Sequence, residues 1–160
     1  MAVDMFLKLD GIDGESKNSK HKDEIDVFSW SWGISVPTAG GTQTGRAQPK
    51  ELTVLKAIDK SSPVLMKAAC EGHPISGGTL TLVNKETQLE YLKIKLTDIL
   101  ISSYQTGGGS AGGAVPMDQI SFNFSAINVQ AADKRGGFEE MSCNFSKDII
   151  FKEQGHDHEK

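Results

Sequence analysis

The sequence predicts a mainly β, antiparallel protein with one short helix, and three observations support this. Apolar and polar residues alternate with a period of two along most of the chain, which is typical of strands with one buried face. Seven or so such segments are separated by glycine-rich or charged turns, and only one segment has helical spacing. Because long alternating strands expose edges that aggregate, we expect a closed or nearly closed barrel; an open sandwich fits the same pattern.

Length and composition indicate one domain and exclude several classes of protein. The 160 residues fall below the ~250 at which chains usually split into domains. A formal net charge of −4 does not suit a nucleic-acid partner. The chain contains no run of ~20 apolar residues, and Asp4 stands where a signal peptide would be basic. We therefore expect one domain over 1–151, a polar and disordered tail over 152–160, no membrane insertion and no cleavable signal peptide.

The first part of the chain is expected to hold three strands joined by two surface loops. The strands are the alternating segments 3–9, 25–36 and 51–58. The charged segment 15–24, which contains His21, has no periodicity and is expected to be solvated. Residues 38–48 hold three glycines and no long apolar residue, so we expect a long mobile loop there.

The segment 25–36 has one large apolar face and one small polar face. The side chains expected inside the barrel are those of Phe28, Trp30, Trp32 and Ile34, and the residues expected to point out of it are Ser29, Ser31 and Gly33. The two tryptophans suggest a stacking platform for a sugar or base, but their shared face with Phe28 and Ile34 favours packing in the core.

One helix is expected, from Ser62 to Glu71. Ser62 can accept a hydrogen bond from an unpaired N–H of the first turn, and Pro63 fits that turn. Gly72 can end the helix in a left-handed conformation. Its apolar stripe consists of Leu65, Met66 and Ala69.

The second half of the chain is expected to contain four further strands. They are the segments 79–83, 90–104, 120–129 and 141–151. In the third of these the apolar phase changes, and we expect a β-bulge near Ser125 or Ala126 to absorb one residue. The glycine-rich segment 107–113 is expected to be a flexible tether.

No combination of residues in the sequence indicates catalysis. Cys70 and Cys143 are too few for a disulfide framework or a zinc site, and both are interpreted as reduced core residues. The segment 107–113 lacks the lysine of a phosphate-binding loop. His156 and His158 suggest a metal chelate, but an unstructured tail is favoured because a structural zinc site needs four fixed ligands. We expect no enzyme activity, no catalytic residues, no metal and no cofactor.

Nine motifs, in order along the chain, resemble those of one known family. They are Ala2–Leu9, Gly14–Ser16, Glu24–Val27, Ser29–Gly33, Asp59–Pro63, Glu90–Leu92, Ile101–Ser103, Thr106–Gly109 and Ser121–Phe124. Their order and spread closely resemble the Hcp family, the haemolysin-coregulated proteins of bacterial type VI secretion. The resemblance extends to about residue 151 and is to the single-domain members.

The resemblance implies a two-sheet β-barrel with a lateral helix, assembled as homohexameric rings. The rings are expected to stack into the inner tube of a contractile, phage-tail-like injection machine. The partners implied are other copies of the chain, the type VI spike protein, contractile sheath components, and small effector proteins that the ring carries or chaperones in its lumen. The implied location is the bacterial cytoplasm, followed by export through the type VI apparatus. The alternative is a monomeric ligand-binding β-barrel that uses Trp30 and Trp32 as an aromatic platform.

Two surfaces are candidate contact sites. Ser29 and Ser31 point out of the barrel, and short hydroxyl groups suit a smooth channel wall better than a packed interface. We expect them to face the lumen and the effector, with bulk solvent as the alternative. The loop is expected to make inter-subunit or ring-stacking contacts through Thr38, Gly40, Gly41, Thr42, Gln43, Thr44, Gly45 and Arg46.

Overall fold

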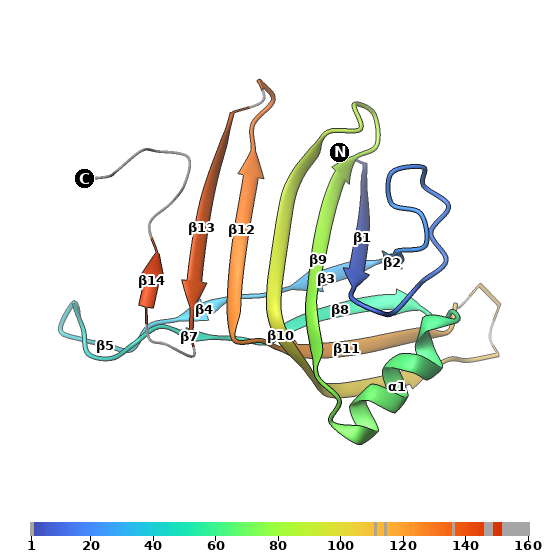
Figure 1. Cartoon of the computed structure of the whole chain (residues 1–160), viewed down its shortest axis with the longest axis horizontal. Coiled ribbons are helices and arrows are strands. Elements are labelled where there is room, and N and C mark those ends of the chain that lie inside the picture. Colours follow the sequence, from blue (N-terminus) through green and yellow to red (C-terminus); the bar gives the residue numbers. More distant parts are fainter. Residues whose placement is uncertain (1, 111, 114, 136, 146–148, 152–160) are drawn as a thin grey trace.

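A computed structural model shows two antiparallel sheets that share one long strand, β10 (Glu90–Gly107) (Figure 1). It describes residues 2–110, 112–113, 115–135, 137–145 and 149–151. The tail 152–160 lies outside these ranges. The mainly β, antiparallel fold with one helix agrees with the class that the sequence predicts.

The first sheet has the strand order β14–β13–β12–β10–β9–β1–β2, and the second has the order β10–β11–β8–β3. The bounds in the first sheet are β1 Val3–Leu9, β2 Ile25–Val27, β9 Ile75–Asn84, β12 Ala126–Ala132, β13 Phe138–Asn144 and β14 Ile149–Phe151. The bounds in the second are β3 Ser29–Ser31, β8 Leu52–Ala57 and β11 Met117–Asn123. The core lies between the two sheets.

Strand β10 passes from the first sheet to the second through a bend at Asp98. Asp98 has the left-handed φ of 53°, which a residue with a Cβ rarely adopts. Ser125 supports the bend, because its Oγ donates to Asp98 Oδ2 at 3.0 Å and its backbone N–H donates to Thr97 O at 2.9 Å. The expected bulge near Ser125 is wrong. The chain there ends β11, turns, and begins β12 in the other sheet, and this break accounts for the change of apolar phase.

On the other side of the molecule the chain passes from the first sheet to the second by continuing from β2 into β3. Among the described residues no ladder pairs β2 with β3, so the barrel is nearly closed and not fully closed by hydrogen bonds. Phe28 joins these two strands, and its backbone N–H donates to Leu55 O on β8 at 2.7 Å. Ile25 and Val27 point into the core, whereas Phe28 is 66% exposed and Ile34 is also exposed. The expected inward orientation of Phe28 and Ile34 is therefore wrong. The chain changes sheets at Phe28, so one alternating pattern does not continue across the whole segment 25–36.

The core is formed by apolar side chains from both sheets and from helix α1 (Ser61–Glu71). Its fully buried members include Leu7, Ile25, Leu52, Val54, Leu65, Leu80, Ile99, Ile120, Phe122 and Ile127. Cys143 is buried among them, as expected. Cys70 is exposed, so its assignment to the core is wrong. It lies outside the helix face that buries Leu65 and Ala68.

Helix α1 ends as predicted but begins differently. Gly72 has the left-handed φ of 63°, and its N–H and that of His73 donate to carbonyls of the last turn. The helix begins at Ser61, whose N–H donates to Asp59 Oδ1 at 2.9 Å, so Ser62 is not the capping residue. Ser62 is buried instead, and its Oγ accepts a hydrogen bond from the N–H of Asp59 at 3.1 Å.

A fully buried ion pair lies beneath the start of α1. Lys56 and Asp118 are each 0% exposed, stand opposite each other on β8 and β11, and lie 2.9 Å apart between Nζ and Oδ2. Lys56 Nζ also contacts Asp59 Oδ1 and Ser62 Oγ, each at 3.0 Å. Tyr104 on β10 donates to Asp118 Oδ2 at 2.7 Å. The network therefore links three strands of the second sheet to the helix.

Hydrogen bonding sets the charge state of Asp118. Burial alone raises the pKa of this carboxyl group, but hydrogen bonds, chiefly those from Ser62 and Tyr104, outweigh burial and lower the pKa to about 2. Burial and the hydrogen bond to Asp118 raise the pKa of Tyr104 above its usual range. Asp118 is therefore ionised throughout the neutral and mildly acidic range.

The charged segment 15–24 exposes its lysines and Asp23, as expected, but two of its residues, Ser16 and His21, are buried against the barrel. His21 is 7% exposed, and its ring stacks on Phe6 with centroids 4.6 Å apart. Its Nδ1 lies 3.0 Å from Glu24 Oε1, and its Nε2 lies 2.8 Å from Glu90 Oε2. Phe6 interrupts the alternation of β1 because it packs beneath this segment on the outer side of the first sheet.

The glycine-rich segment 38–48 forms part of a two-stranded arm and not an irregular loop. Strand β4 (Ile34–Ser35) pairs with β7 (Gln48–Pro49), and β5 (Thr38–Ala39) pairs with β6 (Thr42–Gln43). Gly40 and Gly41 connect β5 to β6 with φ of 59° and 83°, which suits a tight two-residue hairpin turn. We call residues 34–49 the arm; it projects away from the barrel, on the left of Figure 1.

The low pKa of Asp118 predicts acid sensitivity. The folded-state pKa of Asp118, about 2, lies below the ordinary value of 3.8. The ionised carboxylate therefore stabilises the folded protein fully above pH ~4, and this stabilisation is lost as pH falls through 2. This contribution amounts to about 2 kcal/mol. We expect the difference in free energy of unfolding between the wild type and Asp118→Asn to narrow by about that amount between pH 5 and pH 2, measured by denaturant titration. A difference that stays constant with pH would contradict this assignment.

The buried pair also predicts that its members depend on each other. Lys56→Met leaves Asp118 ionised and without its cation, so we expect a loss of about 3–5 kcal/mol. The double variant Lys56→Met/Asp118→Leu removes both charges and is expected to recover at least half of that loss. Denaturant unfolding of the two single variants and the double variant measures the coupling. Additive losses would show that the two charges do not stabilise each other.

Candidate functional site: an uncharged sheet face and a projecting arm

The outer face of the second sheet carries no charged side chain among its paired residues. The register of its four strands places outward Ser29, Ser31, Thr53, Leu55, Ala57, Leu100, Ser103, Gln105, Met117, Gln119, Ser121 and Asn123. The two charged residues of these ladders, Lys56 and Asp118, point inward to the buried network. We call this surface the neutral face.

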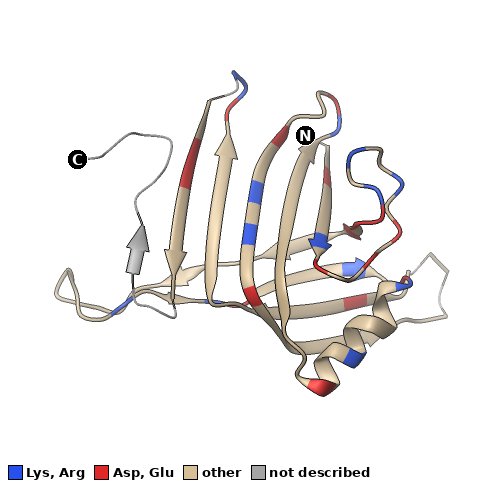
Figure 2. Ribbon diagram, viewed as in Figure 1, with Lys and Arg blue, Asp and Glu red and all other residues tan. Residues whose placement is uncertain are grey.

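The outer face of the first sheet is charged. It carries Lys8, Asp26, Glu90, Lys93, Lys95 and Glu140. Blue and red segments mark this sheet in Figure 2. Lys93 Nζ lies 3.1 Å from Glu90 Oε1, and hydrogen bonds from Gln130 and Asn128 lower the pKa of Glu140. The two outer walls of the barrel therefore differ in chemistry.

Ser29 and Ser31 lie on β3, the edge strand of the neutral face. Both are exposed and point out of the barrel, as the alternation predicts. They line a hollow of about 240 Å³, together with Thr53, Leu55 and Gln119. Thr53 Oγ1 and Ser121 Oγ are hydrogen-bonded at 3.0 Å, so hydroxyl groups continue across the next two strands.

The arm brings the expected loop residues together. Those residues are Thr38, Gly40, Gly41, Thr42, Gln43, Thr44, Gly45 and Arg46. Gln43 Nε2 donates to Gly45 O at 2.7 Å, and the N–H of Thr44 donates to Pro37 O at 2.9 Å. These bonds close the outer part of the arm.

The tryptophans belong to the wall of the core and not to an exposed platform. Trp30 and Trp32 are half-buried and pack against the core cluster. The ring centroid of Trp32 lies 6.3 Å from that of Phe124, which in turn lies 6.2 Å from that of Phe145. The expectation that both tryptophans contribute to the core agrees with this packing.

The described residues contain no reaction centre that we can identify. Burial raises the pKa of the Cys143 thiol, which disfavours its reactive form. Within the described ranges, no group of three or more His, Cys, Asp or Glu residues could hold a metal ion. His156 and His158 lie outside those ranges. The same ranges contain no helix long and apolar enough to cross a membrane.

These features define a β-barrel protein whose function depends on its surfaces. Residues 6–130 match the family described as "Type VI secretion system effector, Hcp". The chain is 38% identical over 161 residues to Protein hcp1 of Pseudomonas aeruginosa, covering 93% of this chain and 99% of that protein. Hcp1 from Salmonella typhimurium matches with a TM-score of 0.83 and 33% identity, covering 94% of this chain and all of that one. A type VI secretion system effector from Yersinia pestis matches with a TM-score of 0.75 and 30% identity, covering 88% of this chain and 99% of that one.

The chain therefore belongs to the Hcp family of type VI secretion proteins. This membership confirms the resemblance carried by the sequence motifs. The family consists of structural, secreted proteins and not of enzymes, so the expectation that the chain is not an enzyme is also confirmed.

Proposed function

We propose that this protein is the subunit of a type VI inner tube. Six copies form a ring, the rings stack into a tube, and the tube is exported from the bacterial cytoplasm through the type VI apparatus. The ring lumen carries or chaperones small effector proteins, and the tube contacts the spike protein and the contractile sheath. Family membership supports this function, and the contrast between the two outer faces is the observation that carries the assignment of the lumen.

The neutral face suits a channel wall for electrostatic reasons. A wall lined by one sign of charge would attract some effectors strongly and repel others, because fields are focused in a narrow channel. Hydroxyl and amide groups form exchangeable hydrogen bonds with any polar surface and impose no charge selection. The charged face of the first sheet suits water or other proteins. We therefore assign Ser29 and Ser31 to the lumen.

The free edges of the second sheet support ring formation. In the described part of the chain, β3 pairs only with β8, so its other edge carries unpaired backbone groups. The C-terminal half of β10 forms the opposite edge of that sheet. Exposed edges favour association with another chain, and two different edges permit the head-to-tail contacts that close a ring.

Enlarging Ser31 tests the lumen assignment. Ser31 is exposed on a strand surface, so Ser31→Glu and Ser31→Gln should change the free energy of unfolding by less than about 0.5 kcal/mol and leave the ring intact. Ser31→Glu places an unpaired carboxylate against the effector, which should weaken retention roughly tenfold. Co-purification of a small effector with the ring measures this. Thr97→Gln, an exposed hydroxyl residue on the first sheet, is the matched control.

The outcomes separate three locations for Ser31. Normal rings that retain the effector equally well with both substitutions would reject the lumen and place Ser31 in bulk solvent. Loss of rings would place Ser31 at a subunit interface. Effector loss in the Thr97 control would show that the assay does not distinguish the two faces.

Removing the arm tests its role in assembly. Replacing residues 38–48 with a short glycine linker removes no member of the core cluster, so the barrel should remain folded by circular dichroism. We expect the variant to form no stable rings or no stacks of rings, as judged by native mass spectrometry and electron microscopy. Stacks identical to those of the wild type would refute the contact role of the arm.

A further inference from the structure

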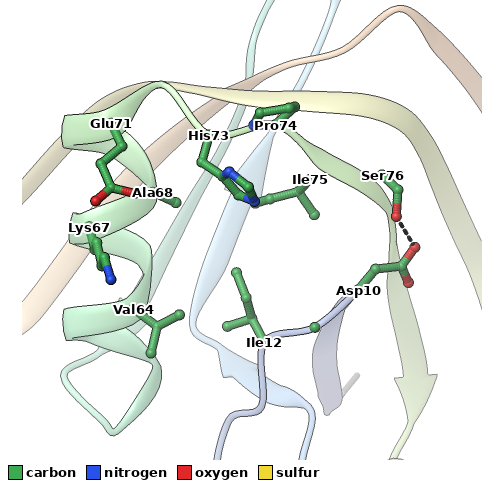
Figure 3. Close-up of a pocket in the computed structure, with 11 residues that line it drawn as sticks. Asp10, Ile12, Val64, Lys67, Ala68, Glu71, His73, Pro74, Ile75 and Ser76 are labelled. Carbon is green, nitrogen blue, oxygen red and sulfur yellow. Dashed lines mark hydrogen bonds between the residues drawn. The ribbon is translucent and has the colours of Figure 1, made fainter.

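A groove lies between helix α1 and the turn that follows β1 (Figure 3). Its volume is about 530 Å³. The groove is lined by Asp10, Gly11, Ile12, Val64, Lys67, Ala68, Glu71, His73, Pro74, Ile75 and Ser76. It lies at the α1 end of the molecule, whereas the arm projects from the opposite end of the long axis (Figure 1).

The groove has an apolar floor and a polar rim. Ile12, Ala68 and Ile75 are buried and form the floor, while Val64 is 48% exposed at one side. Figure 3 shows the side chains of Val64 and Ile12 pointing into the open space between them. An apolar surface with ionisable groups around it fits a protein segment that has both an apolar side chain and a charge.

Two carboxylates give the rim its acidic character. Asp10 Oδ2 accepts a hydrogen bond from Ser76 Oγ at 2.8 Å and thus has a fixed position at one end. Glu71 lies on the helix at the other end, with Lys67 one turn before it. The lining contains two acidic residues and one lysine, so a segment with a positive charge complements it.

The arm has the complementary chemistry. Between residues 33 and 50 the chain contains Arg46 and Lys50 and no acidic residue. Val36 and Ile34 are each 42% exposed, which leaves two large apolar side chains on the arm without cover from the barrel. The arm therefore offers apolar side chains and positive charge on a narrow two-stranded segment.

We infer that the groove accepts the arm of a second copy of this chain in the next ring. The inference rests on the proposed tube function and adds the surface that receives the arm. Because arm and groove lie at opposite ends of the long axis, a copy displaced along that axis brings its arm toward the groove of its neighbour. A contact between two different surfaces repeats without limit in one direction, as the stacking of rings requires. In this contact Val36 covers the apolar floor, and Arg46 faces the carboxylate of Glu71.

Disulfide cross-linking tests the contact directly. In a Cys70→Ser background, which removes the exposed native thiol, Val36→Cys is combined with Val64→Cys. Both positions are exposed, so the fold should be unaffected, as circular dichroism can verify. Under mild oxidation at a concentration where rings stack, we expect disulfide-linked oligomers on non-reducing gels. Val36→Cys with Val115→Cys is the control, because Val115 is a similarly exposed valine outside the groove.

Charge exchange provides a second measurement. Arg46→Glu and Glu71→Arg should each reduce ring stacking at least tenfold, and the double variant should restore it to within about threefold of the wild type. Rings that stack normally without the Val36–Val64 cross-link would overturn the inference and leave the proposed function intact. A strict monomer would overturn both. Equal cross-linking with Val115 would also reject the groove, because it would show that the arm contacts other copies without selectivity.

Discussion

The bend in β10 is the constraint on which the rest of the structure depends. One 18-residue strand is hydrogen-bonded first within one sheet and then within the other, so its direction change at Asp98 determines how the sheets face each other. The apolar side chains of both sheets can then meet in a single core. The same bend turns the two outer faces in different directions. The separation of a charged wall from a neutral wall, on which the proposed lumen depends, is therefore a consequence of backbone geometry as well as of composition.

The buried ion pair fixes the helix relative to the second sheet. A buried pair of charges contributes little net stability compared with well-packed apolar residues, because desolvation offsets the attraction. Its geometric requirements are strict, since Lys56 must meet Asp118 on the neighbouring strand and Ser62 on the helix. Helix α1 forms one side of the groove, so the network also sets the shape of the surface that we assign to the arm. The buried network on the inner side of helix α1 therefore also affects the assembly contact that we assign to the groove beside the helix.

Local pattern predicted much of this molecule, and long-range packing accounts for what it missed. Period-two alternation identified the strands and the outward direction of Ser31, and the helix ends at Gly72 because that signal is local. Phe28 was placed on the wrong side because alternation does not reveal where a chain changes sheets. His21 and Lys56 are buried by partners that lie far away in the sequence. For Lys56, the one hint in the sequence is that a charged residue occupies a position that the alternation of its strand assigns to the core. The assignment of Ser29, Ser31 and the arm to contacts stays a prediction. The groove was not predicted, since it joins three separate segments.

The most direct test of the central claim is a symmetry-resolved electron cryo-microscopy map of the purified assembly, at a resolution that places side chains. Our account predicts six-fold rings in which the neutral face lines the lumen, with Ser29 and Ser31 on its surface and the charged face of the first sheet turned away from it. Rings lined by the first sheet, with Lys93 and Lys95 in the lumen, would contradict the account.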